Sequence, residues 1–505
     1  MVQIVTMSGV LEDDTRFIEE TAPSAIVAET VARLREGKPP RDLLRAAAIA
    51  VSRSTDLPLD HHGGPVHPIA GIHAVTDVAS RLKGDWAYMP IIHSVALANK
   101  HCHHPEMGPA LMPEIPRGEK PIVVDAEKLS LRAAIDRLEP NLAQRSLVEL
   151  VDRCTPGELL DLMMDQAIRR NPLDDHYFLY PVLAMRGLQD IGWDCARVVL
   201  RPAIRFLASN ARTLGVDGTE FNVAYVRANV ASLERFADEV DGLLEQNGLS
   251  KANPPIHTSP AENASVGALA RAIGTAENFR EIPGMVAGAL GKGLSLEGAV
   301  EAMSIGGSMI HLRTDYGNPF DVHFATGMNT RRYLIAQPEV SMRNKITALL
   351  CWSYGPEIRL AEDKMTWPLD DDAAPGPVAG QAQLLDRITE VIMAHPRRSI
   401  LEASKWAVEK VAAGAETRAI MAMARRYVAE GFDPSALFTR LSEIICRDDF
   451  AEMHTFKHLQ CLAEEYAATR DPFKSVHLVS AVKEVACSYG IVQDVYMHAR
   501  EHLAV

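Results

Sequence analysis

Apolar residues recur along most of this chain at the spacing of an amphipathic helix. The repeat is clear in LLDLMMDQAI (159–168), VVLRPAIRFLAS (198–209) and VSAVKEVACSYG (479–490). Runs that alternate between apolar and polar residues, which are typical of half-buried strands, are scarce. The pattern therefore predicts an all-α protein built as a bundle of helices.

Clusters of proline and glycine interrupt the helical stretches and mark the expected breaks between helices. They lie at HHGGPVHP (61–68), QNGLSKANPPIHTSPAEN (246–263), YGNPF (316–320) and WPLDDDAAPGPVAGQ (367–381). We expect the second cluster to be a linker between two parts of the chain.

Four histidines occupy the same place in four similar segments: His67, His176, His323 and His454. In each segment a helix-like stretch is followed by a break that contains Asp, Gly or Pro, then by the histidine and a second helix-like stretch. If the segments are repeats, a closed bundle can bring the four imidazoles to one point. Because imidazole is the commonest side-chain ligand for transition metals, the pattern predicts a metal centre.

The four segments are of two types. In the short type, at His176 and His454, the histidine follows the first leucine of a helical stretch by 17 residues. The long type, at the other two histidines, has a Thr-Asp and a proline before the histidine and a glycine four residues beyond it. The order long, short, long, short predicts a duplication that gives two pseudo-equivalent halves, residues 1–250 and 251–505, with the metal site at their interface.

The composition excludes several classes of protein. Of the 505 residues, 47% are hydrophobic, which is enough for one large core or several domains. The 52 Lys and Arg against 66 Asp and Glu give a net charge of −14, so nucleic acid is not an expected partner. Seven cysteines without a Cys-x-x-Cys pair argue against a disulfide framework, a zinc ribbon or an iron–sulfur cluster. With neither a signal-peptide pattern nor an apolar run of about 18 residues, the chain is expected to be soluble and cytoplasmic, with no membrane segment.

Lys457 is an unusual neighbour for a predicted metal ligand. It lies three residues after His454, which places both side chains on one face of a helix, whereas His458 points off that face. An ammonium group beside a metal ion and inside an apolar bundle is strongly disfavoured. We expect the lysine to lose its proton, to turn toward solvent, or to be carboxylated by CO2 and so become an anionic oxygen ligand.

Several segments resemble those of a known family. Asp448, Asp449 and the His-x-x-Lys of His454 and Lys457, followed by LQCLAEEYAATRDP, resemble the C-terminal motif of questin oxidase-like proteins. The stretch DHHGGPVHPIAGIHA resembles the histidine-rich N-terminal stretch of that family. Its central block is similar to LGKGLSLEGAVEAMSIGGSMI, followed downstream by DVHFATGMNTRRYL.

The resemblance implies an oxygenase that acts on aromatic polycyclic molecules and cleaves a ring. Part of that family holds a mononuclear non-haem iron through four histidines and a carboxylated lysine. Carried over to this chain, the resemblance implies an Fe(II) centre with O2 and an aromatic small molecule as substrates. The implied ligands are His67, His176, His323, His454 and, as a carbamate, Lys457.

The donor set independently favours a redox-active metal. Four imidazoles and one oxygen anion leave one position of an octahedron open for O2 or substrate, although zinc or another divalent metal also fits. Aromatic neighbours of the histidines are expected to form a dry wall: Tyr177, Phe178, Tyr180, Phe320, Phe324 and Phe456. Tyr177 and His62, the latter as a proton shuttle close before His67, are the expected catalytic residues.

Other clusters have simpler explanations. His73 is expected to face away from the predicted site. Arg331 and Arg332 are expected on a solvated helix face. Three further histidines are expected in a polar loop that follows a helix: His101, His103 and His104.

Two other classes of protein remain open at this point. One is a helical-repeat binding or scaffold protein whose histidines merely cap helices, and the other is a haem protein with two histidine ligands. The chain has no Gly-x-Gly-x-x-Gly after a strand and no Gly-x-Ser-x-Gly, His-Glu-x-x-His or Walker motif. A bound nicotinamide or flavin is therefore not expected. The sequence does not decide between a monomer and a dimer.

Overall fold

A computed structural model of the chain describes most of its residues. The described ranges are 3–54, 66–105, 111–116, 122–173, 175–209, 220–314, 322–359, 361–369, 380–394, 415–448, 453–490 and 493–505. All regular elements in these ranges are helices, and a lone β-bridge joins Ile4 to Pro113, so the predicted all-α class is confirmed. No helix in the described ranges is long and apolar enough to cross a lipid bilayer.

The chain divides into two compact units, each made of separate parts of the sequence. Unit 1 contains residues 1–76, 90–240 and 333–356, and unit 2 contains residues 77–89, 241–332 and 357–505. Each unit therefore includes residues from both sides of position 250. The pseudo-equivalence of two sequential halves stays a prediction.

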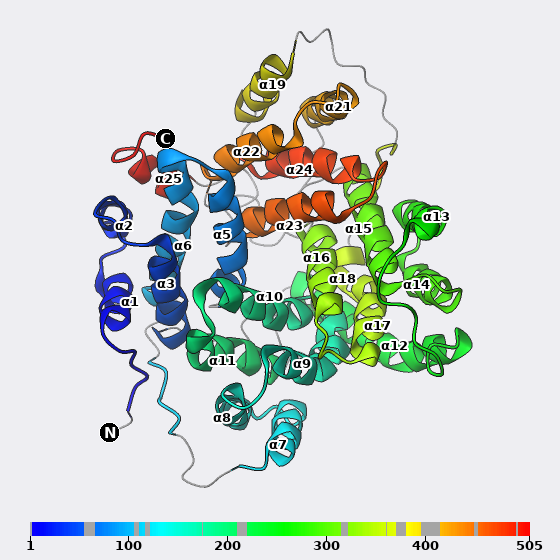
Figure 1. Cartoon of the computed structure of the whole chain (residues 1–505), viewed down its shortest axis with the longest axis horizontal. Helices are drawn as coiled ribbons and strands as arrows, with labels where there is room; N and C mark the ends of the chain where they lie inside the picture. Colours follow the sequence, from blue (N-terminus) through cyan, green and yellow to red (C-terminus); the bar gives the residue numbers. More distant parts are fainter. Residues whose placement is uncertain are drawn as a thin grey trace. The chain divides into compact units, whose positions relative to one another are not determined.

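Unit 1 is a bundle in which α9, α10 and α11 pack side by side, with α4 against α10 and α8 against α11 (Figure 1). Its helices are α1 (Val10–Glu20), α2 (Ile26–Arg35), α3 (Pro40–Ser54), α4 (Val66–Ala70), α7 (Val124–Asp136), α8 (Pro140–Val151), α9 (Pro156–Arg170), α10 (His176–Ile191), α11 (Ala196–Leu207) and α17 (Met342–Cys351). Short 3-10 turns lie at η2 (Asn171–Leu173), η3 (Trp193–Cys195) and η8 (Trp352–Tyr354).

Local sequence signals explain the ends of the helices in this bundle. The Thr155 hydroxyl accepts a hydrogen bond from the backbone N of Glu158 at 3.2 Å, and the Glu158 carboxylate accepts one from the backbone N of Thr155 at 2.8 Å. This capping box and Pro156 at the first helical position begin α9. Gly192, with φ 111°, ends α10 in a conformation that glycine adopts readily.

In unit 2, helices α15, α21, α22 and α23 all pack against α24 (Figure 1). The helices of unit 2 are α13 (Asn263–Gly274), α14 (Ile282–Gly291), α15 (Leu296–Arg313), α19 (Gln381–Ala394), α21 (Ala415–Ala429), α22 (Pro434–Ile445), α23 (His454–Ala468), α24 (Ser475–Ser488) and α25 (Asp494–Ala499), with 3-10 turns at η1 (Gly84–Tyr88), η5 (Pro260–Glu262) and η6 (Phe279–Glu281). Helices that contain residues of both units are α5 (Ile72–Arg81), α6 (Met89–Cys102), α12 (Glu220–Gln246), α16 (Val322–Ala336) and α18 (Pro356–Arg359).

Helices α13 and α15 approach closely because α15 carries a glycine where they cross. A Cβ atom on Gly306 would lie 2.7 Å from Cβ of Ile273 and 3.1 Å from the carbonyl oxygen of Ala270. A Cβ atom on Gly274 would likewise lie 2.6 Å from Cβ of Met309. The absence of side chains at these two positions lets the backbones come together.

The segment predicted to be a linker, residues 246–263, is packed onto the beginning of α15. The backbone N of Leu296 donates to the carbonyl of Pro255 at 2.9 Å, and that of Glu297 donates to Ile256 at 3.0 Å. The division between the units falls at residues 240 and 241, inside α12. The linker prediction is wrong because the first backbone N–H groups of α15 donate hydrogen bonds to this proline-rich loop. The composition of the loop does not reveal those bonds.

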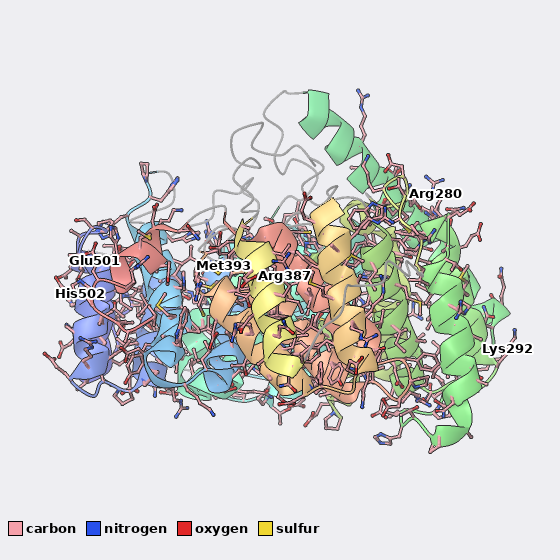
Figure 2. All side chains as sticks on the ribbon, turned by 90° about the horizontal axis from the view of Figure 1, so that it is seen from above. Arg280, Lys292, Arg387, Met393, Glu501 and His502 are labelled. Atoms are coloured by element: carbon pink, nitrogen blue, oxygen red, sulfur yellow. The ribbon has the colours of Figure 1, made fainter. Side chains whose placement is uncertain are left out.

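Polar side chains such as Arg280, Lys292, Arg387 and His502 extend from the surface (Figure 2). Many imidazoles, in contrast, lie in the interior. The buried histidines among the described residues are His67, His93, His101, His176, His311, His323, His458 and His477, none more than 5% exposed. Because a buried imidazole requires polar partners, these residues are the natural starting point for a functional site.

Candidate metal centre

Each of the four recurrent histidines lies at the beginning of a helix. His176 and His454, of the short type, are the first residues of α10 and α23. His67 and His323, of the long type, are the second residues of α4 and α16. The helix predicted at each histidine is confirmed. The histidine is one position further into its helix in the long type than in the short type.

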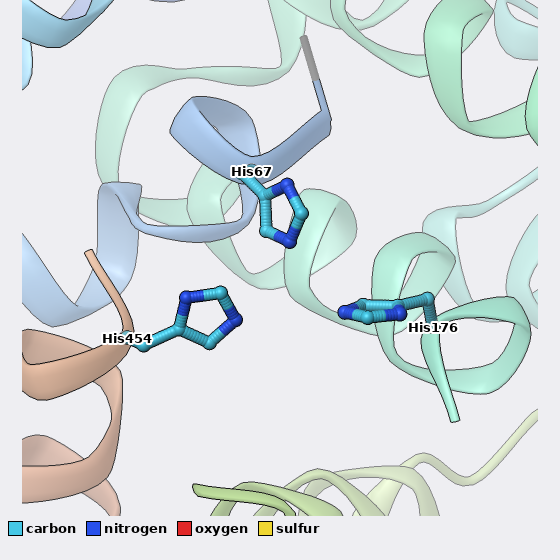
Figure 3. A group of neighbouring side chains, drawn as sticks. All are labelled: His67, His176 and His454. Carbon is cyan, nitrogen blue, oxygen red and sulfur yellow. The ribbon is translucent and has the colours of Figure 1, made fainter. Parts of the chain in front are cut away.

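His67 and His176 approach each other in the interior of unit 1 (Figure 3). The residues are 4% and 5% exposed, and their ring centres are 5.2 Å apart with an interplanar angle of 83°. Two imidazoles bound to one tetrahedral metal through bonds of about 2.0–2.1 Å have ring centres about 5 Å apart. The separation of the two rings thus fits two ligands of a four-coordinate ion, and it is also a distance at which aromatic rings pack edge to face.

Tyr180 contacts both of these imidazoles. Its hydroxyl lies 3.0 Å from Nε2 of His67, and its ring centre is 4.8 Å from that of His176. Tyr177, the tyrosine expected to be catalytic, packs its ring against Phe206 at a centre-to-centre distance of 4.5 Å. The sequence placed Tyr180 only in the aromatic wall, so its contact with His67 is new, and the catalytic role of Tyr177 stays a prediction.

His454 and Lys457 lie in the first turn of α23, in unit 2. Figure 3 also draws His454, which, like His67 and His176, offers a ring nitrogen that could bind a metal ion. Lys457 is only 4% exposed, so the alternative in which it turns toward solvent is wrong. The other two alternatives, a neutral amine and a carbamate, stay predictions.

The remaining predicted site residues have different outcomes. His323 is 2% exposed, and its role as a ligand stays a prediction because it belongs to neither group of possible ligands found among the described residues. His62 and Phe320 lie outside the described residues. The described members of the predicted aromatic wall are all buried: Tyr177, Phe178, Tyr180, Phe324 and Phe456.

Sequence reasoning missed a second group of possible ligands, formed in unit 2 by His311, His458 and Glu484. They come from α15, α23 and α24, so no local motif joins them. Burial, and then the charges of Lys483 and His458, lower the pKa of His311 well below its usual value, which keeps the ring neutral. The sequence held one signal for this group, the carboxylate of Glu484 within the largely apolar helix α24. A carboxylate is costly to bury without a partner.

Two arginines predicted on a solvated helix face are instead engaged inside unit 2. Arg331 is fully buried and donates from Nη1 to the carbonyl of Gly327 at 2.7 Å. Arg332 pairs with the fully buried Glu465, with Nη2 and Oε2 2.6 Å apart. The solvated-face prediction is wrong because α16 is covered on this side by α23, which the sequence of α16 alone does not show.

The other histidine clusters are part of the packing. Nδ1 of His73 and Oδ2 of Asp190 lie within hydrogen-bond distance, 2.8 Å apart. His101 is buried in the last turn of α6, which ends at Cys102, so the polar-loop prediction is wrong for His101. His103 and His104 follow the end of that helix.

Comparisons of this chain with protein families, with curated proteins and with solved structures find no match.

Proposed function

We propose that this protein is a metal-dependent oxygenase that oxidises or ring-cleaves an aromatic small molecule. The proposed metal is Fe(II), held by His67, His176 and His454, with His323 and carboxylated Lys457 as further ligands. The proposal joins the recurrence of the histidines in the sequence to the geometry of the imidazoles in unit 1. It also agrees with the resemblance to questin oxidase-like proteins.

The pair formed by His67 and His176 carries the proposal. Two buried rings 5.2 Å apart have the separation of two ligands on one ion, and both come from the beginnings of helices. Edge-to-face contact at this distance is also a usual geometry of packed rings, so the recurrence of the histidine pattern at the beginnings of α16 and α23 is what favours a metal site over simple packing. Imidazole nitrogens suit iron, copper and zinc, and a carbamate oxygen would add the anionic donor that favours iron.

The chain's own groups would prepare such a site in two ways. The hydroxyl of Tyr180, 3.0 Å from Nε2 of His67, would orient that ring before a metal binds. Tyr177, Phe178 and Phe206 present buried aromatic surface that excludes water and suits a flat substrate. A bound iron ion would supply the redox chemistry that allows O2 to react with an aromatic ring.

Metal analysis of the purified full-length protein tests the proposal. We expect iron in the protein isolated from cells, and the loss of that iron in His67→Ala, His176→Ala and His454→Ala. His502→Ala, at an exposed position, is the matched control and should retain the metal. Full iron occupancy in a variant that lacks both His67 and His176 would overturn the proposal.

Activity and spectra separate the proposed function from the two other classes. With iron bound, O2 consumption should increase on addition of a polycyclic phenol from a panel and should be absent in His176→Ala. A helical scaffold would contain no stoichiometric metal. A haem protein would show a Soret band in its absorption spectrum.

A further inference from the structure

A carboxylate and two imidazoles meet in the interior of unit 2. Oε2 of Glu484 lies 3.1 Å from Nδ1 of His458 and 3.9 Å from Nε2 of His311. The exposed fractions of the three side chains are 4%, 0% and 0%. The two ring centres are 5.3 Å apart, which again matches two imidazoles on one tetrahedral ion, for which the separation is about 5 Å.

Hydrogen bonds account for only part of this arrangement, in which Nδ1 of His458 and Oε2 of Glu484 are 3.1 Å apart. Neither ring nitrogen of His458 has a hydrogen-bond partner of good geometry among the described residues, although the ring is fully buried. Oε2 of Glu484, the atom nearest to both rings, lacks one as well. Buried polar groups without partners are costly, and they commonly mark the position of an ion or water.

In two of these groups, His311 and Glu484, the polar atom that faces away from the cluster is hydrogen-bonded to a serine. Nδ1 of His311 is 2.6 Å from Oγ of Ser480, and Oε1 of Glu484 accepts a hydrogen bond from Oγ of Ser488 at 2.7 Å. These contacts hold the ring of His311 and the carboxylate of Glu484 in place, with Nε2 of His311 and Oε2 of Glu484 3.9 Å apart. Metal sites use the same device, in which a second hydrogen bond to the ligand fixes its orientation.

The neighbouring cation is kept away from this carboxylate. Lys483 is fully buried, and its ammonium donates to the carbonyl and hydroxyl oxygens of Thr314, both at 2.7 Å, and to the carbonyl of His311. Those three acceptors match the three donors of an ammonium group.

We propose that His311, His458 and Glu484 form a second metal site, one that takes a divalent first-row transition metal such as Zn2+. Two histidines and one carboxylate are a donor set found in both zinc and non-haem iron sites. The site differs from the one proposed above, since His458 lies four residues, about 6 Å along the helix axis, beyond His454. The two proposals share no ligand and stand or fall separately.

Zinc titration of the metal-stripped full-length protein tests this inference. We expect Glu484→Gln and His458→Ala to bind one equivalent less Zn2+ than the wild-type protein. Ser488→Ala, which removes only the supporting hydrogen bond, should weaken that equivalent about 10–100-fold. Glu501→Gln, at an exposed position, is the control and should bind as the wild type does.

The result distinguishes the two sites. His67→Ala combined with His176→Ala should still bind the equivalent that Glu484→Gln loses. Equal Zn2+ stoichiometry and affinity in Glu484→Gln and the wild type would overturn the inference. If the variants do not fold, anomalous diffraction at the zinc edge of wild-type crystals grown with Zn2+ gives the answer. A peak within about 2.0–2.2 Å of the three ligand atoms supports the site, and the absence of a peak there refutes it.

Discussion

Nη2 of Arg332 lies 2.6 Å from Oε2 of Glu465, and this ion pair joins α16 to α23 inside unit 2. Asn329, also on α16, donates to Oε1 of Glu465 at 3.1 Å. Burial raises the pKa of Glu465, but Arg332 lowers it further, so the carboxyl group is an anion. The two helices that the pair connects are those that begin at the predicted ligands His323 and His454.

Removal of Glu465 is expected to destabilise the protein strongly. Glu465→Ala leaves the guanidinium of Arg332 without its partner in the interior, which should lower the free energy of unfolding by about 3–5 kcal/mol. Urea denaturation followed by circular dichroism measures the change. Glu390→Ala, which breaks an exposed pair with Arg387 at 3.2 Å, is the control and should change stability by less than about 1 kcal/mol. Similar losses in both variants would show that the buried pair has no special role.

Stability is expected to fall as the pH decreases from about 6.5 to 4, in part because of His477. Burial lowers the pKa of this imidazole from 6.5 to about 4, with Glu465 and Arg332 acting in opposite directions. In this window the unfolded chain binds a proton that the folded chain does not, so the free energy of unfolding rises with pH. The contribution of His477 between pH 7 and pH 5 is about 2 kcal/mol.

Replacement by glutamine isolates this contribution. His477→Gln keeps polar groups near Ser308 and Thr469, which lie 2.9 and 3.0 Å from the ring nitrogens, but does not titrate. The difference in unfolding free energy between the two pH values should therefore be smaller than in the wild type. His502→Gln should reproduce the wild-type difference. An unchanged difference in His477→Gln would mean that this ring is protonated in the folded protein.

The crossing of α13 and α15 should not tolerate a methyl group at Gly306. Its Cβ atom would lie 2.7 Å from Ile273, so Gly306→Ala must separate the helices, at a cost of about 1–3 kcal/mol. Gly284→Ala on α14 meets nothing within 4 Å and should raise stability by about 0.5–1 kcal/mol. Thermal unfolding of the two variants measures both effects. A neutral Gly306→Ala would show that the crossing is loosely packed.

Loss of the Tyr180 hydroxyl should strengthen metal binding at His67. The phenol lies 3.0 Å from Nε2 of His67 and competes with a metal for that atom. Removal of one hydrogen bond, worth about 0.5–1.5 kcal/mol, should raise affinity roughly 2–10-fold in Tyr180→Phe. Competition titration with a chromophoric chelator, in the Glu484→Gln background, measures the change. Tyr427→Phe, which loses a bond to the carbonyl of Asp433, is the control, and weaker binding in Tyr180→Phe would instead make the phenol a ligand.

Carboxylation of Lys457 should be visible directly. Protein equilibrated with 13C-labelled bicarbonate and a diamagnetic divalent metal should show a carbamate signal in its 13C NMR spectrum. The signal should disappear in Lys457→Ala, where added short carboxylic acids should restore part of the metal binding. Lys292→Ala, at an exposed position, should keep the signal. A carbamate signal that survives in Lys457→Ala would assign the modification to another lysine.

The features that the sequence predicted are local ones. The helix that follows each recurrent histidine could be predicted because Asp, Gly and Pro breaks and helical periodicity lie within a few residues of it. The contact between Tyr180 and His67 could not, since it depends on how α4 packs on α10. The same holds for His311 and Glu484, which are 173 residues apart in sequence and meet only through the packing of α15 on α24.

Helix α23 carries His454 in its first turn and His458 in its second. Because both belong to one helix, the angle between their side chains around the helix axis is fixed. A residue inserted before position 454 would shift both side chains together and preserve their mutual angle. A residue inserted between the two positions would rotate one against the other by about 100°. The four-residue spacing inside the helix therefore fixes the two histidines relative to each other, and a change in that spacing would uncouple them.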